Sequence, residues 1–178
     1  HNTFALIEST SNQVDQYGGY TGMTPTQFVS MVNSLAVEEG LPASEILLGG
    51  DHLGPNSWRK RTGSEAMEEA CRLVEQYVAA GYRKIHLDAS FICADDSVPL
   101  RAEVIVKRCV DMARAAEQVT TGDDKPIYVI GTEVPVPGGV TEDEAITVTT
   151  PDGVRTTLAA FQSAFVNSGL EAAWKRVI

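Results

Sequence analysis

The chain has 178 residues, with 14 lysines and arginines against 24 aspartates and glutamates, so its formal net charge is −10. This acidic balance argues against nucleic acids and anionic membranes as partners, because both bind basic surfaces. At 43% hydrophobic residues the chain can build a sizeable core, and no apolar run approaches the roughly 18 residues that a membrane span needs. We therefore expect one globular domain over residues 1–178.

Cysteine usage bears on the compartment. The three cysteines are an odd number and form no C-x-x-C pair, which argues against a disulfide framework and a zinc ribbon. Cys71 and Cys109 lie in helical patterns and are expected to be small buried hydrophobic residues. Residues 1–4 lack the charged start and apolar stretch of a secretory signal. Together these features favour a reducing cytoplasm.

Short apolar runs alternate with longer amphipathic stretches, which predicts strands that alternate with helices. Four strands are expected, at residues 4–7, 46–48, 84–87 and 127–130. Between them we expect helices from Pro25 to about Gly40, from Ser64 to Gly81 and from Pro99 to about Gln118. After the last strand, a loop from Gly131 to about Pro151 precedes a helix carrying Phe161 and Phe165, which is followed by a short helix through Trp174. Thr24, Pro25 and Gln27 stand at the spacing of a capping box at a helix start. The order is that of an α/β fold with a parallel sheet, and it does not separate a doubly wound sheet from a (β/α) barrel.

Polar residues follow every predicted strand. In parallel α/β folds, active sites form at the carboxyl ends of the strands. The polar residues after the four strands are, in order, Glu8, Asn12 and Gln13; Asp51 and His52; His86, Asp88 and Ser90; and Glu133. Four successive strands that deliver carboxylates and histidine to one rim indicate a functional site.

Each of these residues also has a purely structural explanation. Asp51 can serve as a turn or cap residue, and a lone histidine such as His52 is more often a hydrogen-bonded loop residue than a ligand. The two glycines at residues 49–50 favour close backbone approach, which strengthens the case for a site. His86 shares a strand face with Asp88, although a hydrogen-bonded core histidine is its more ordinary role.

Taken together, histidine and carboxylates suit a divalent metal, for which zinc is the first expectation. Such an ion acts as a Lewis acid on a sugar carbonyl and stabilises an enediolate, while an adjacent aspartate moves the proton as general base. His52 and Glu133 provide two ligands, whereas a catalytic zinc normally has three protein ligands and one open position. The predicted metal site is therefore incomplete within this sequence.

Four segments carry a family resemblance. They are ESTSNQVDQYGGYTGMTP at residues 8–25, GGDHLGPN at 49–56, KIHLDAS at 84–90 and IGTEVPVPGG at 130–139. These long motifs resemble the non-catalytic (Z-type) subunit family of bacterial tagatose-1,6-bisphosphate aldolases, and the resemblance covers essentially the whole chain. Since that family resembles class II, metal-dependent aldolases, it implies a partial (β/α) TIM barrel that holds roughly strands 2 to 5.

The resemblance implies a role for each of several residues. Asp51 matches the proton-transferring aspartate of the class II Asp-His pair, and His52 matches its metal-ligand histidine. Glu133, followed at a fixed distance by two glycines, matches a glutamate after the fifth strand, and we expect it to bind the metal. The further histidine ligands and the phosphate-binding loops of such aldolases lie on later strands.

Four residues are expected to bind substrate, a small sugar phosphate. Asp88 and Ser90 match an Asp-x-Ser segment of the class II aldolases. Asn12 and Gln13 occupy the same rim, after the first predicted strand.

The resemblance leaves three interpretations of function open. The first is a subunit that supports a catalytic (Y-type) aldolase subunit in cleaving tagatose 1,6-bisphosphate to glycerone phosphate and glyceraldehyde 3-phosphate, in galactitol and amino-sugar breakdown. The second is a stand-alone metal-dependent aldolase or ketose 4-epimerase with Asp51 as base. The third is a partner-binding scaffold without a site of its own.

Length sharpens the expectation about the fold. A complete (β/α)₈ barrel needs about 250 residues, so four strand–helix units at this length make about half of one. Half a barrel leaves two sheet edges open. We therefore expect either that the sequence is part of a longer chain or that another copy covers those edges.

Overall fold

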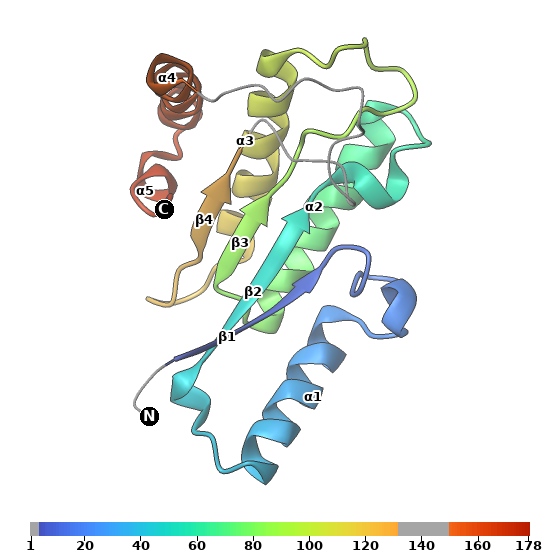
Figure 1. The fold of residues 1–178 in the computed structure, drawn as a ribbon, viewed down its shortest axis with the longest axis vertical. Coiled ribbons are helices and arrows are strands. Elements are labelled where there is room, and N and C mark those ends of the chain that lie inside the picture. The colour runs from blue at the N-terminus through green and yellow to red at the C-terminus, as the bar shows by residue number, and fades with distance from the viewer. Residues whose placement is uncertain (1–3, 132–149) are drawn as a thin grey trace.

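A computed structural model describes residues 4–131 and 150–178 (Figure 1). Within these residues, four strands form one parallel sheet in the order β1-β2-β3-β4. The strands are β1 (Ala5–Thr10), β2 (Ile46–Leu53), β3 (Lys84–Leu87) and β4 (Ile127–Ile130). The α-helices are α1 (Pro25–Glu38), α2 (Gly63–Ala80), α3 (Ala102–Val119), α4 (Pro151–Asn167) and α5 (Glu171–Trp174). No helix in this part of the chain is both long and apolar enough to cross a bilayer.

The strand order separates the two architectures that the sequence pattern left open. A doubly wound sheet reverses its strand order and carries helices on both faces. Here the order is sequential, so each right-handed crossover steps the same way and places its helix on the same face. Consecutive helices accordingly pack against one another, and Figure 1 shows α2 and α3 side by side behind the sheet. The expected α/β fold, a partial (β/α) barrel, is confirmed.

β4 also pairs with residues near the C-terminus of the described chain. Val177 forms a parallel bridge with Tyr128. Tyr128 donates its N–H to the carbonyl of Arg176 at 2.9 Å and accepts from the N–H of Ile178 at 2.9 Å. The residues after α5 thus continue the sequential strand order, as expected for the start of a further barrel strand.

Several element boundaries differ from the predictions. β1 continues to Thr10 rather than ending at residue 7. β2 runs through the Gly-Gly-Asp-His segment to Leu53, because β1 and β3 pair with it on both sides. α2 begins at Gly63, one residue before Ser64, and its N-cap is Thr62, which forms a capping box with Glu65. α3 begins at Ala102 rather than at Pro99, because Arg101 has extended backbone angles (φ −75°, ψ 140°) and acts as the N-cap.

The hydrophobic core lies between the sheet and its helices. The strands contribute Ile85, Leu87 and Tyr128, all fully buried. The helices contribute large side chains that are likewise fully buried, namely Leu73, Tyr77, Met112, Phe161 and Phe165. Cys109 is buried as expected, whereas Cys71 is half-buried; both are free thiols.

Candidate metal centre

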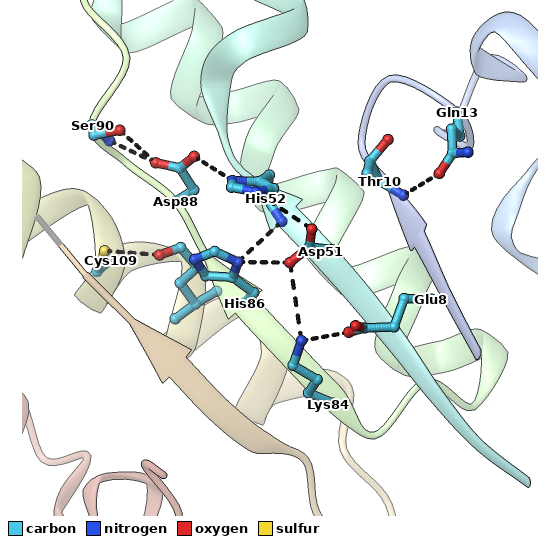
Figure 2. Close-up of polar contacts among 11 residues, drawn as sticks. Glu8, Thr10, Gln13, Asp51, His52, Lys84, His86, Asp88, Ser90 and Cys109 are labelled. Atoms are coloured by element: carbon cyan, nitrogen blue, oxygen red, sulfur yellow. Dashed lines mark hydrogen bonds and ion pairs between the residues drawn. The ribbon is translucent and has the colours of Figure 1, made fainter. Parts of the chain in front are cut away.

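Charged and imidazole side chains from three strands meet on the sheet face opposite the helices (Figure 2). β1 supplies Glu8, β2 supplies Asp51 and His52, and β3 supplies Lys84 and His86. Asp88 follows β3 directly. Asp51, His52, His86 and Asp88 lie toward the carboxyl ends of β2 and β3, where the sequence predicted a site, whereas Lys84 is the first residue of β3.

A bulge in β2 brings two consecutive side chains to the same place. In a regular strand, Asp51 and His52 would point to opposite faces. Here the residues from Gly50 to Leu53 on β2 lie opposite only those from Ile85 to Leu87 on β3, so β2 holds one extra residue. His52 has φ 51°, the left-handed region that residues other than glycine rarely adopt. Such a conformation costs about 1–3 kcal/mol and is typically retained at functional sites.

Three glycines leave the space that this arrangement needs. A Cβ at Gly49 would lie 2.5 Å from Oε1 of Glu8, and one at Gly50 would lie 2.7 Å from the ring of Tyr77. A Cβ at Gly54 would lie only 1.7 Å from the carbonyl oxygen of Asp88. The expectation that the glycines at 49–50 allow close approach is confirmed.

Asp88 fixes the ring of His52. Its Oδ2 lies 3.0 Å from Nδ1 of His52, and its Oδ1 accepts the N–H of Ser90 at 3.1 Å and the hydroxyl of Ser90 at 2.7 Å. Asp88 is fully buried, and its Oδ2 is placed to accept a hydrogen bond from Nδ1–H of His52, which selects the tautomer with the proton on Nδ1. The lone pair of His52 Nε2 is therefore free to bind an ion. A carboxylate behind a histidine in this way is the usual outer support of a metal ligand.

Asp51 stands between the two histidines. Its Oδ1 lies 2.8 Å from Nδ1 of His86, and its Oδ2 lies 3.4 Å from Nε2 of His52. Partial burial opposes its ionisation, but the hydrogen bond from His86 and the charges of His52, His86 and Lys84 outweigh burial and lower the pKa of the Asp51 carboxyl. Asp51 therefore presents an anionic oxygen beside the free imidazole nitrogen.

The donor set fits a divalent metal ion. Asp51, His52 and His86 each offer a ligand atom, and these atoms lie within 4.8 Å of one another. Two ligands of one tetrahedral zinc, each 2.0–2.1 Å from the ion, lie about 3.3–3.4 Å apart, which matches the 3.4 Å between His52 Nε2 and Asp51 Oδ2.

Charge balance points to the same kind of ion. Glu8, Asp51 and Asp88 bring three carboxyl groups to the cluster against the single ammonium of Lys84. A bound cation would offset this excess of acidic groups.

His86 belongs to the candidate ligand set, although the sequence favoured a structural role for it. Its side chain is 14% exposed and hydrogen-bonded, as a core histidine would be, but its partner is Asp51. The signal was present in β3, where Ile85 and Leu87 occupy the core face and alternation therefore places His86 on the other face with Lys84.

The other predicted residues lie at the rim or outside the described part. Gln13 Oε1 accepts the N–H of Thr10 at 2.9 Å, and Asn12 Oδ1 accepts the hydroxyl of Ser57 at 3.1 Å. Both side chains thus close the loop after β1. Glu133 lies outside the described residues. The predicted substrate contacts of Asn12, Gln13, Asp88 and Ser90 stay predictions, although Asp88 has its oxygens engaged within the protein.

A sequential parallel sheet with helices on one face and an acid–histidine cluster on the other places the chain in the class of (β/α)-barrel folds. Residues 1–178 match the family model described as "D-tagatose-1,6-bisphosphate aldolase subunit GatZ/KbaZ-like". The chain belongs to this family.

A solved structure shares the fold. It is the crystal structure of a probable tagatose 6 phosphate kinase from Sinorhizobium meliloti, which is 38% identical to this chain with a TM-score of 0.87. The match covers 99% of this chain and 42% of that protein, so the chain spans less than half the length of its relative.

Proposed function

We propose that the intact protein binds one divalent metal ion, zinc first, at Asp51, His52 and His86. The observation that carries this proposal is the 3.4 Å between His52 Nε2 and Asp51 Oδ2, with His52 held by the buried Asp88. Glu133 remains a proposed further ligand.

We further propose that the protein is a subunit of tagatose-1,6-bisphosphate aldolase that supports cleavage of its substrate to glycerone phosphate and glyceraldehyde 3-phosphate. When bound, the metal supplies Lewis acidity to the substrate carbonyl. Asp88 holds His52 in one tautomer, and His86 holds the Asp51 carboxylate. Asp51, kept ionised by its neighbours, takes or returns the proton at Oδ1, because Oδ2 is the oxygen proposed to bind the metal. Family membership supports a catalytic partner subunit and a cytoplasmic sugar-phosphate pathway.

The strained backbone of His52 favours a second candidate, in which the intact protein is itself the aldolase or a ketose 4-epimerase. A site without a function has no reason to retain a positive φ at a non-glycine residue beside a cluster of carboxyl groups. In this version Asp51 is the base of retro-aldol chemistry in the same barrel.

Zinc titration calorimetry of the intact protein tests the metal site. We expect one zinc per chain, about a 100-fold loss of affinity in His52→Ala, and a 10–100-fold loss in Asp88→Asn, as for outer supports of metal ligands. Ser57→Ala, at the same rim but outside the cluster, is the matched control and should bind as the unsubstituted protein does. Zinc binding that survives His52→Ala unchanged would place the ion elsewhere.

Activity assays separate the two candidate functions. Cleavage of tagatose 1,6-bisphosphate, and C4 epimerisation of ketose phosphates, are measured with the protein alone and with a catalytic aldolase subunit. Activity only in the mixture supports the subunit function. Activity of the protein alone, abolished in Asp51→Asn, supports the second candidate. No effect in either format leaves the scaffold interpretation.

A further inference from the structure

Directly beneath the proposed metal site, an ion pair crosses the sheet. Glu8 of β1 pairs in register with Gly49 of β2, and Gly49 pairs with Lys84 of β3. Because Gly49 has no side chain, the carboxylate of Glu8 reaches over β2 and binds the ammonium of Lys84 (Figure 2). Both side chains are mostly buried, with 32% of Glu8 and 17% of Lys84 exposed.

Lys84 is also close to the proposed metal site. Its Nζ lies 4.0 Å from Oδ1 of Asp51, beyond hydrogen-bond distance but within reach of a small side-chain movement. An ammonium in direct contact with Asp51 would neutralise that carboxylate and compete with a metal ion for it. The position of Lys84 between two carboxylates therefore decides how available Asp51 is.

We propose that Glu8 is a positioning residue that holds Lys84 away from Asp51, and that Gly49 provides the space for it to do so. The inference deepens the proposed metal site and rests on it. Glu8 holds the ammonium of Lys84 level with Gly49 in the sheet. Asp51 then stays hydrogen-bonded to His86 and accessible on the side that faces His52.

Glu8→Gln is the primary test. The amide is of similar size but carries no charge, so Lys84 should swing to Asp51. We expect zinc affinity of the intact protein to fall about tenfold or more, the usual range for residues that support metal ligands.

The double variant Glu8→Gln/Lys84→Met distinguishes this role from a merely structural one. Removing Lys84 removes the competitor, so zinc affinity should return to within about threefold of the unsubstituted protein. A structural defect at Glu8 would instead persist or grow with the second substitution. Affinity unchanged in Glu8→Gln, or a double variant as weak as the single one, overturns the inference.

Gly49→Ala gives an independent route to the same result. Its Cβ would lie 2.5 Å from Glu8 Oε1, the atom that binds Lys84. All three nearest atoms, Oε1, Cγ at 2.9 Å and Cδ at 3.1 Å, belong to the side chain of Glu8, so this side chain and its carboxylate must move aside. Gly49→Ala should therefore weaken zinc binding as Glu8→Gln does, and Lys84→Met should again restore it; a lack of restoration counts against the inference.

A crystal structure of Glu8→Gln decides the inference whether or not zinc binds. We expect Lys84 Nζ within about 3.2 Å of an Asp51 oxygen; a lysine that keeps its place beside residue 8 overturns the proposal. Failure of the unsubstituted protein to bind zinc would instead contradict the proposed metal site, so the two failures are distinguishable.

Discussion

The two faces of β3 show how differently the two sides of this sheet are used. Ile85 and Leu87 face the helices and are fully buried among hydrophobic side chains. The alternate residues, Lys84 and His86, are 17% and 14% exposed, and they form ion pairs and hydrogen bonds with Glu8, Asp51 and His52. One face of the strand is thus built for packing and the other for chemistry.

This contrast is informative because barrel interiors are normally filled by branched apolar side chains. Ion pairs in such a position stabilise a protein little, and often less than well-packed apolar residues would. Retaining Glu8, Asp51, Lys84 and His86 there is therefore better explained by binding than by stability.

The largest loss of stability is expected at Gly54, where the backbone after β2 contacts the backbone of Asp88 after β3. Gly54 directly follows β2 and lies against Asp88, whose N–H donates to the carbonyl of Leu53 at 2.9 Å. In Gly54→Ala, the new Cβ would lie 1.7 Å from the Asp88 carbonyl oxygen, so one of the two backbone segments would have to shift. We expect the free energy of unfolding to fall by about 3 kcal/mol or more, with zinc binding lost as His52 and Asp88 separate.

Chemical denaturation and zinc titration measure these two losses. Gly131→Ala is the control, because no described atom lies within 4 Å of the Cβ that it adds; its stability should change by less than about 0.5 kcal/mol. Equal stability of the two alanine variants would show that the backbone of residue 88 is not held against residue 54.

Neighbouring residues of β3 offer the sharpest separation of the two faces. Ile85→Ala removes fully buried atoms and should lower the free energy of unfolding by about 3 kcal/mol, while zinc affinity stays within about twofold because no ligand is held by Ile85. His86→Ala removes the hydrogen bond to Asp51, which costs about 1 kcal/mol of stability. It also removes a proposed ligand, so zinc binding should weaken about 100-fold, as in His52→Ala.

The same two assays on both variants check this separation. If Ile85→Ala weakens zinc binding as much as His86→Ala does, the faces are coupled through the strand. Packing on one face of β3 and metal binding on the other would then not be separate.

The strand bounds that the sequence predicts correctly are those that depend on local pattern alone. The bounds of β3 and β4 were predicted as observed, because both are short runs, alternating in β3 and apolar in β4, that lie between turn and loop residues. The continuation of β2 through Asp51 and His52 was missed, since glycine and aspartate are poor strand formers and only pairing with both neighbouring strands holds them extended.

The site was predicted in part for a related reason. Asp51 and His52 were recognised because they adjoin each other in a motif. The contacts of Glu8 with Lys84 and of His86 with Asp51 join residues 76 and 35 positions apart. They depend on strand register and on the absent side chain of Gly49, which no local pattern encodes.

The smallest loss of stability is expected at the N-terminus of α2, where one side chain caps the helix. Thr62 caps α2: its hydroxyl accepts the N–H of Glu65 at 3.3 Å and donates to the Glu65 carboxylate at 2.7 Å. Thr62→Ala should cost about 1 kcal/mol and leave zinc affinity unchanged, whereas Thr62→Ser keeps the cap and should lose little. Urea denaturation measures both variants.

The pH dependence of that loss tests its cause. The hydrogen bonds from Thr62 lower the pKa of Glu65, so the contact stabilises the fold only while Glu65 is ionised. Its contribution is present above the usual glutamate pKa, roughly 4.3, and is lost as pH falls through the lower folded value. The gap in stability between Thr62→Ala and the unsubstituted protein should therefore narrow from about pH 5 to about pH 3. A constant gap would mean that Thr62 acts through its backbone partner alone, since the accepted N–H does not titrate.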